Sequence, residues 1–251
     1  MARWKLTLEY DGGGFVGWQR QLNGLSVQEA VEEAVFAFTG ERAVLHVAGR
    51  TDAGVHALAQ VAHVDLAKPT DANTVRNAVN FHLRMHRVSV LAVDAVDENF
   101  HARFSAIQRA YLYRILDRRP PPAIDKGRVW WVSQPLDVAA MNAAAALLPG
   151  RRDFSTFRAA NCQADGPVKT LEVLTATRIG AEIVIHARAR SFLYHQVRNM
   201  VGTLKLVGEG KWTKEDVARA LAACDRTQGG PTAPPEGLYL TDVVYPDSFR
   251  P

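Results

Sequence analysis

The chain has 251 residues, enough for one large domain or two modest ones with a sizeable buried core. Apolar residues make up 47% and charged residues 22%, a composition typical of globular proteins that argues against a disordered or fibrous chain. Because no stretch approaches the roughly 20 apolar residues that span a bilayer, and the N-terminus lacks a signal-peptide core, we expect a soluble, cytoplasmic protein without a membrane partner.

The first half of the chain predicts alternating strands and helices. Polar and apolar side chains alternate over residues 5–10, which is the period of a half-buried strand. Ser26 and Glu29 form a capping box before a helix that ends at Gly40. A second helix, capped by Thr70 and Asp71, is predicted over residues 72–82. Further strands are expected at 43–47, 58–65 and 88–93.

The glycines after the first strand match a dinucleotide-binding motif. Gly12, Gly14 and Gly17 have the spacing of the Rossmann fingerprint, in which the last glycine lies at the start of a helix. Here residues 18–24 intervene before any helical pattern begins. An NAD(P)-dependent oxidoreductase is therefore only a minor alternative.

A polar turn between two valine-rich segments is the first candidate site. Gly49 and Gly54 bound it and allow backbone bends that residues with a Cβ resist. The turn presents Arg50 and Asp52 on a sharp connection. An ordinary turn aspartate that bonds its own backbone is the alternative interpretation from spacing alone.

The pattern restarts at Ala110 and predicts a second αβ unit. Two strands joined at Gly180 read as a hairpin. The layout resembles that of the first half, so we interpret the chain as an internal duplication joined near residues 104–109. The predicted strands are 111–116, 170–178, 181–190 and 238–245, and the predicted helices are 136–148, 192–207 and one capped by Thr213 and Asp216.

Basic residues supply candidate phosphate contacts. Seven of the 30 basic residues are lysine, which leaves 23 arginines, and the formal net charge is +4. Arginine suits phosphates because its planar guanidinium makes paired hydrogen bonds, although a GC-rich genome produces the same bias. The candidates are Arg84 and Arg87, Arg118 and Arg119, Arg151 and Arg152, and His186, Arg188 and Arg190 on one face of a strand.

Metal binding is not expected. His56 and His63 lack a third ligand at a supporting spacing, so structural roles are favoured for both. Cys162 and Cys224 have neither metal-ligand spacing nor a CxxC pattern, which is typical of a reducing compartment.

Four segments resemble those of one enzyme family. Residues 49–57, Gly-Arg-Thr-Asp-Ala-Gly-Val-His-Ala, resemble the catalytic signature of the tRNA pseudouridine synthase A family, in which the aspartate is catalytic. Residues 100–106 resemble the link into that family's second half, 111–113 its active-site tyrosine strand, and 192–202 the helix that delivers a basic residue to the aspartate. Ala59 and Gln196 depart from the pattern, where glycine and methionine are common.

The resemblance implies an α+β fold. It would consist of two similar ferredoxin-like (RRM-like) αβ halves, residues 1–105 and 106–251. The halves would form one extended, mainly antiparallel sheet with helices on one face and the active cleft between the halves.

The resemblance also implies an isomerase that converts uridine to pseudouridine at positions 38, 39 and 40 of the tRNA anticodon stem-loop. It implies a homodimer that needs no cofactor or metal. The implied catalytic residues are Asp52, Tyr111 and Arg198, and the implied substrate-binding residues are Arg50, Tyr111, Arg103 and Phe104. The main alternative from another class is a non-catalytic RNA-binding module of the same fold.

Overall fold

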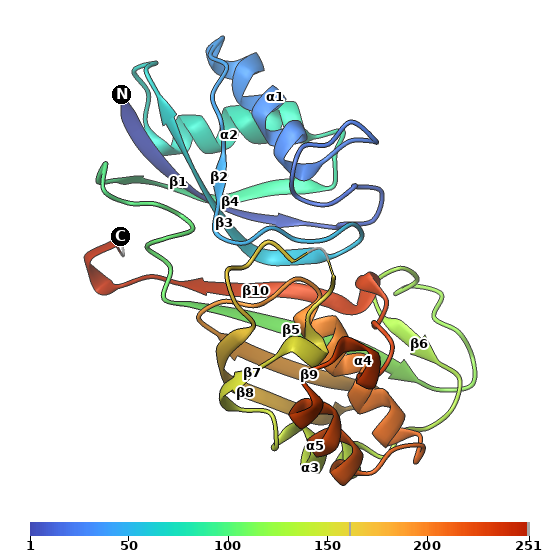
Figure 1. Ribbon diagram of the computed structural model, residues 1–251. Helices are drawn as coiled ribbons and strands as arrows, with labels where there is room; N and C mark the ends of the chain where they lie inside the picture. The colour runs from blue at the N-terminus through green and yellow to red at the C-terminus, as the bar shows by residue number, and fades with distance from the viewer. Residues whose placement is uncertain (161, 250–251) are drawn as a thin grey trace. The chain divides into compact units, whose positions relative to one another are not determined.

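The computed structural model describes residues 1–160 and 162–249. The chain divides into two compact units, each of which is described by itself (Figure 1). The first combines Met1–Arg109 with the residues from Tyr239 onward, and the second is Ala110–Leu238. The halves 1–105 and 106–251 stay a prediction; the compact units differ from them in grouping the last strand with the N-terminal segment. Among the described residues, no helix is long and apolar enough to cross a bilayer.

The first unit is a sheet covered by two helices. Its strands follow the order β4-β1-β3-β10, with β2 also paired to β3. Strand β1 is antiparallel to β3 and β4, and its register sets Trp4 against Val64 and Leu6 against Ala62, all of them buried. The elements are β1 (Ala2–Tyr10), α1 (Val27–Thr39), β2 (His46–Val47), β3 (His56–Leu66), α2 (Ala72–Leu83), β4 (Val88–Val96) and β10 (Leu238–Val244).

Local caps place the two helices of this unit. The Ser26 side chain accepts the Glu29 backbone N–H at 3.1 Å, and Gly40 ends α1 with φ +76°. Asp71 caps α2 in the same way through Thr74. Helix α1 packs against α2 and α2 against β4, and Figure 1 draws both helices on the same side of these strands.

The second unit repeats the sheet-and-helix plan. Its strands follow the order β5-β9-β8-β7, and α3 packs on β8 and against α4 and α5. The β8–β9 hairpin turns at Gly180, which has φ +58°. The elements are β5 (Gln108–Asp117), β6 (Trp130–Val132), α3 (Val138–Ala145), β7 (Gly150–Asp153), β8 (Val168–Ile179), β9 (Glu182–Ala189), α4 (Gln196–Gly208) and α5 (Lys214–Ala223).

Both units contain the same strand arrangement. In the first, β3 lies between β1 and β2; in the second, β9 lies between β5 and β8. In the first unit, β1, α1, β2 and β3 form a strand–helix–strand–strand repeat whose third strand lies between the first two, as in ferredoxin-like folds. In the second unit, β5, α3, β8 and β9 have the same arrangement, with the short strands β6 and β7 added. Parallel pairing joins β10 to β3 and β6 to β5. The predicted α+β class, with two similar and mainly antiparallel halves, is confirmed.

Three predicted element boundaries are wrong. The helix predicted over 192–207 begins at Gln196, because His195 adopts a left-handed backbone with φ +60° and Leu193 N–H is bonded by the Gln196 side chain at 2.8 Å. The strand predicted over 43–47 shortens to β2, since Leu45 N–H donates to the Glu32 carboxylate. The helix predicted over 136–148 shortens to α3, which Asp137 caps through Ala140.

Candidate active site

The turn that carries Asp52 is held by hydrogen bonds from its surroundings. The Asp52 carbonyl accepts the Val55 N–H at 3.1 Å, which closes the turn, and Gly54 supplies a φ of +78°. The Thr51 hydroxyl lies 2.7 Å from the Tyr10 hydroxyl, and Gln60 donates to the Gly49 carbonyl at 2.7 Å. Asp52 is half-buried. The buried partners therefore fix the backbone on either side of a carboxylate that solvent still reaches.

Arg50 lies on the same turn. Its side chain is exposed, two residues before Asp52. The turn thus presents a cation and a carboxylate from one short connection that leads into β3.

The glycine loop after β1 packs directly behind this turn. The Trp18 N–H donates to the Thr51 carbonyl at 3.0 Å. A Cβ on Gly12 would lie 2.1 Å from the Val55 carbonyl oxygen, and one on Gly17 would lie 2.8 Å from the Thr51 carbonyl oxygen. Two of the glycines in the fingerprint spacing therefore have a packing role, which is to let the loop approach the turn.

A buried arginine ties the turn to a second segment of the first unit. The Arg109 guanidinium donates to the carbonyls of Ala48 at 2.8 Å, Arg103 at 2.7 Å and Ala106 at 3.3 Å. Only 7% of Arg109 is exposed. Sequence reasoning missed this anchor. One feature of the sequence could have revealed it. Arg109 lies on the same face of the predicted strand as Tyr113 and Ile115, which are buried, and a buried charge needs hydrogen-bond partners.

Arg103 and Phe104 lie on that second segment. Both side chains are exposed, with the Arg103 guanidinium 5.5 Å from the centre of the Phe104 ring. The Phe104 ring also contacts His101 at 4.4 Å between ring centres. An exposed aromatic ring beside a cation suits contact with a nucleic-acid base.

Tyr111 belongs to the second unit and lines a hollow of about 270 Å³. Its ring is half-buried and meets Phe192 edge to face at 5.2 Å between ring centres. Tyr113, two residues on, points to the core, where its hydroxyl donates to the Pro234 carbonyl at 2.7 Å. Of the two tyrosines on β5, Tyr111 is the one that a substrate could reach.

Arg198 comes from the first turn of α4 in the same unit. Its Nε donates to the Ala233 carbonyl at 2.8 Å, and its own carbonyl accepts the Ala233 N–H at 3.1 Å. The helix approaches this loop so closely that a Cβ on Gly202 would lie 1.8 Å from the Pro231 oxygen. Arg198 is thereby half-buried and held at one edge of its guanidinium.

The predicted site residues divide between the two units. The first unit brings Arg50, Asp52, Arg103 and Phe104 into one set of hydrogen-bonded segments, while Tyr111 and Arg198 lie in the second. The roles assigned to these residues stay predictions.

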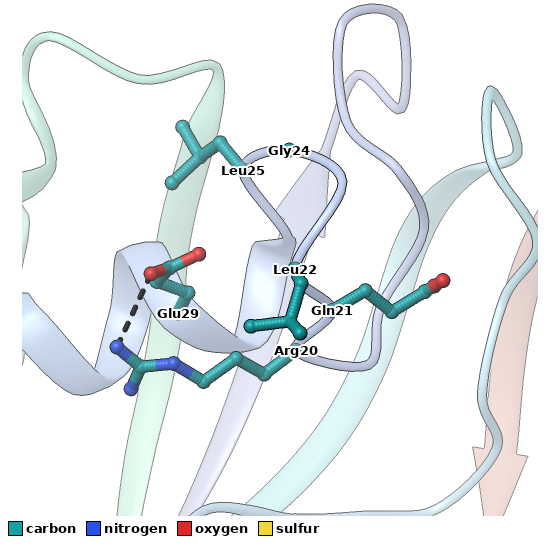
Figure 2. A pocket seen from close by; sticks show the side chains of 6 residues that line it. All are labelled: Arg20, Gln21, Leu22, Gly24, Leu25 and Glu29. Carbon is teal, nitrogen blue, oxygen red and sulfur yellow. Dashed lines mark hydrogen bonds and ion pairs between the residues drawn. The ribbon is translucent and has the colours of Figure 1, made fainter.

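Another hollow lies in the first unit. It has a volume of about 580 Å³ and is lined by Arg20, Gln21, Leu22, Gly24, Leu25 and Glu29. Figure 2 shows Arg20 reaching Glu29 of α1, a contact of 3.1 Å, beside the exposed Leu22. Arg20 also pairs with Glu32 and Glu33, so its charge is already matched by carboxylates of the helix. None of the predicted site residues lines this hollow.

The two histidines considered as metal ligands have backbone partners. The His56 Nδ1 accepts the Gly12 N–H at 3.0 Å, and the His63 Nδ1 accepts the Ala102 N–H at 3.1 Å. Within residues 1–160 and 162–249, no group of three His, Cys, Asp or Glu side chains could hold a metal ion. Both histidines thus have the structural hydrogen bonds that were favoured for them.

We expect His63 to make folding sensitive to acid. Burial first, and then the nearby His101, His46 and Arg3, lower the pKa of His63 from 6.5 to about 4. Its ring lies 4.9 Å from that of His46 and 4.8 Å from that of His101. Between pH 6.5 and 4, His63 is protonated in the unfolded chain but stays neutral in the folded one. The free energy of unfolding therefore falls as the pH falls through this window, by on the order of 2 kcal/mol.

Urea unfolding of the wild type and of His63→Gln at pH 7 and pH 5 measures this effect. The variant should lose less stability than the wild type on acidification. His82→Gln, at an exposed histidine of α2, is the matched control. Its free energy of unfolding should fall between pH 7 and pH 5 by as much as that of the wild type. Equal pH dependence in all three proteins would contradict the prediction.

Comparison with known proteins identifies the family. A model described as tRNA pseudouridine synthase matches residues 7–105 and 144–246. The chain belongs to the tRNA pseudouridine synthase family.

Curated relatives cover almost the whole chain. It is 63% identical over 245 residues to the tRNA pseudouridine synthase A of Rhodospirillum centenum, covering 98% of this chain and 100% of that one. It is 61% identical to the protein of the same name from Paramagnetospirillum magneticum, with 98% and 96% coverage. For Rhodospirillum rubrum the identity is 58%, with 98% and 88% coverage. The resemblance to the tRNA pseudouridine synthase A family, found from the sequence motifs, is confirmed.

Proposed function

We propose that this protein is an isomerase that converts uridine to pseudouridine in tRNA. The observation that carries the proposal is full-length similarity to proteins named tRNA pseudouridine synthase A, at 63% identity over 98% of the chain. The turn with Asp52 supports it, since the chemistry requires a carboxylate beside the ribose and base.

The proposed reaction conserves all atoms of the nucleotide except for one exchanged proton. The bond between ribose C1′ and uracil N1 breaks, the uracil turns in place, and a bond forms between C1′ and C5. The proton on C5 leaves to solvent, and N1 takes up a proton. Asp52 acts as the catalytic carboxylate, either as a nucleophile toward the ribose or base or as a base that removes a ribose proton.

Tyr111 and Arg198 are proposed to serve the same uridine. The half-buried Tyr111 ring offers a face on which uracil stacks, and its hydroxyl can assist proton transfer. The Arg198 guanidinium would keep the Asp52 carboxylate ionised once substrate excludes water. Arg50 is proposed to fill the gap left by an extruded nucleotide, because a stacked guanidinium offsets part of the few kcal/mol of lost stacking.

The finer assignments follow from the family resemblance. The proposed substrates are the uridines at positions 38, 39 and 40 of the anticodon stem-loop, with Arg103 and Phe104 as further contacts to the RNA. We propose a homodimer that works in the cytoplasm. Sedimentation equilibrium tests the dimer, and a monomer at micromolar concentration would contradict it.

Release of tritium tests the proposed function. Unmodified tRNA labelled with tritium at uridine C5 is incubated with the protein, and the label that appears in water is counted. We expect stoichiometric release, with pseudouridine mapped to positions 38–40. Tight tRNA binding without release would instead identify a non-catalytic RNA-binding module. Binding of NAD(P) without either result would favour the oxidoreductase alternative.

A further inference from the structure

We propose that the hollow beside Tyr111 is a binding site for a phosphate group of the RNA backbone, with Arg188 as its main donor. The identity of the partner as RNA rests on the proposed function. The hollow has a volume of about 270 Å³ and lies wholly within the second unit. Its lining residues are Ala110, Tyr111, Val173, Thr175, His186 and Arg188.

Strand register brings these side chains to one open face. Arg188 of β9 is paired with Val173 of β8, and His186 with Thr175. Arg188 and His186 are exposed, while the intervening Ala187 is fully buried on the other face. Strand β5, which carries Tyr111, neighbours β9. The polar side chains of the hollow are therefore fixed by a sheet, which positions groups more precisely than a loop does.

The charge of the Arg188 side chain has no partner among the described residues of its unit. Two other arginines of this unit are held by bidentate carboxylates: Arg114 by Glu182 at 2.8 and 2.7 Å, and Arg178 by Asp117 at 2.7 and 2.6 Å. The Arg188 side chain, by contrast, makes no hydrogen bond or ion pair within the part of the chain that the structure describes.

The chemistry of the lining favours a phosphate. The hollow has a guanidinium, an imidazole and a hydroxyl on its walls and no carboxylate. The fork of an arginine matches two phosphate oxygens, and a charge-assisted pair of this kind is about twice as strong as a neutral hydrogen bond.

Size and the neighbouring ring indicate where that phosphate comes from. A volume of about 270 Å³ lies below the roughly 300–1,000 Å³ typical of sites for whole small molecules and cofactors. Tyr111 forms one wall, and a base stacked on it carries its ribose and phosphate into the same hollow. We therefore assign the site to one backbone phosphate next to the uridine that contacts Tyr111.

The salt dependence of tRNA binding tests this site. Each phosphate contact contributes close to one unit to the slope of log affinity against log salt concentration, because a counterion is released. Dissociation constants for unmodified tRNA are measured between 50 and 300 mM salt for the wild type and for Arg188→Gln. We expect the variant to lose about one unit of slope and roughly tenfold in affinity near 0.1 M salt.

Two further variants make the result specific. Arg219→Gln removes an equal charge from the exposed side of α5, where Arg219 pairs with Asp216, and should keep the wild-type slope. Arg188→Lys keeps the charge and should keep the slope while losing a few-fold in affinity, because the paired hydrogen bonds are gone. If Arg188→Gln keeps the wild-type slope, or Arg219→Gln loses as much, the proposal is wrong.

The outcomes separate this site from the proposed function. Tritium release by the wild type with an unchanged slope in Arg188→Gln would overturn the phosphate site alone. No release by the wild type, with a slope that still depends on Arg188, would overturn the isomerase and retain the site. A few millimolar inorganic phosphate, added at constant ionic strength, should preserve the difference between the two proteins. Loss of that difference would show that free phosphate competes with the RNA for the hollow, which supports a phosphate site there.

Discussion

Replacing Asp52 with asparagine should lower the rate of pseudouridine formation by at least about 10⁴-fold, the scale seen when a nucleophile or its base is removed. Asparagine has nearly the shape of aspartate but neither a negative charge nor a basic oxygen. The turn should survive, because it is closed by the backbone bond from Val55 N–H to the Asp52 carbonyl and held by the Gln60 bond to Gly49. The affinity for tRNA should stay within about threefold, since one half-buried carboxylate is a small part of such an interface.

Asp97→Asn is the matched control for this experiment. Asp97 is an exposed turn aspartate of the same unit whose carboxylate accepts the Asn99 N–H at 2.8 Å, so it has the purely structural role that spacing alone would also allow for Asp52. Its variant should isomerise uridine at the wild-type rate. Single-turnover tritium release and filter binding give the two readouts. More than about a tenth of the wild-type rate in Asp52→Asn would mean that another group is the catalytic one.

Local signals in the sequence predicted most of the fold. Period-two alternation located β1, β3, β8 and β9, and side-chain caps at Ser26, Asp71 and Thr213 located the starts of three helices. These features work because each depends on residues within a few positions of one another. The helix expected over 192–207 failed for the same reason. Its start is set by the left-handed His195 and by the Gln196 side chain, a conformation that the alternation of side chains does not encode.

The surroundings of the candidate site were predictable only in part. The motif around Asp52 was visible in nine consecutive residues. The anchoring of that turn was not, because it depends on Tyr10 and Arg109, which are distant in sequence, and on Gln60 of the following strand. All three meet the turn only through the strand register. Arg109 was overlooked because a buried arginine has no periodic signature. Its significance comes from the carbonyls that surround it.

The spacing of the glycines after β1 did not reveal what they do in the fold. The spacing of Gly12, Gly14 and Gly17 matches a dinucleotide fingerprint letter for letter. In the fold, Gly12 and Gly17 are the two buried members, and each lies against the backbone of the turn at Asp52, whereas Gly14 is exposed. Backbone approach is what both kinds of motif require of glycine, so sequence alone could not separate them.

The second large effect is expected from Gly17→Ala, which should nearly abolish activity and destabilise the first unit. Gly17 has φ +109°, a backbone that costs an L-residue about 1–2 kcal/mol. Its Cβ would also lie 2.8 Å from the Thr51 oxygen, 3.1 Å from Ala53 N and 3.2 Å from the Asp52 carbonyl carbon. These are backbone atoms that cannot rotate away, so the loop and the turn must separate, at roughly 1–3 kcal/mol more. A separation that moves the Asp52 carboxylate by about 1 Å can cost on the order of 10²-fold in rate.

Gly14→Ala isolates the contact from the backbone cost. Gly14 lies in the same loop with φ +92°, yet nothing lies within 4 Å of the Cβ that alanine would add. Both variants place an alanine in a left-handed backbone, but only the Cβ added by Gly17→Ala would clash with the turn that carries Asp52. Urea unfolding and tritium release should therefore show a modest loss of stability and near-normal activity for Gly14→Ala, and large losses of both for Gly17→Ala. Equal behaviour of the two variants would mean that the loop does not position Asp52, and that the close approach of Gly17 to the turn matters for neither folding nor catalysis.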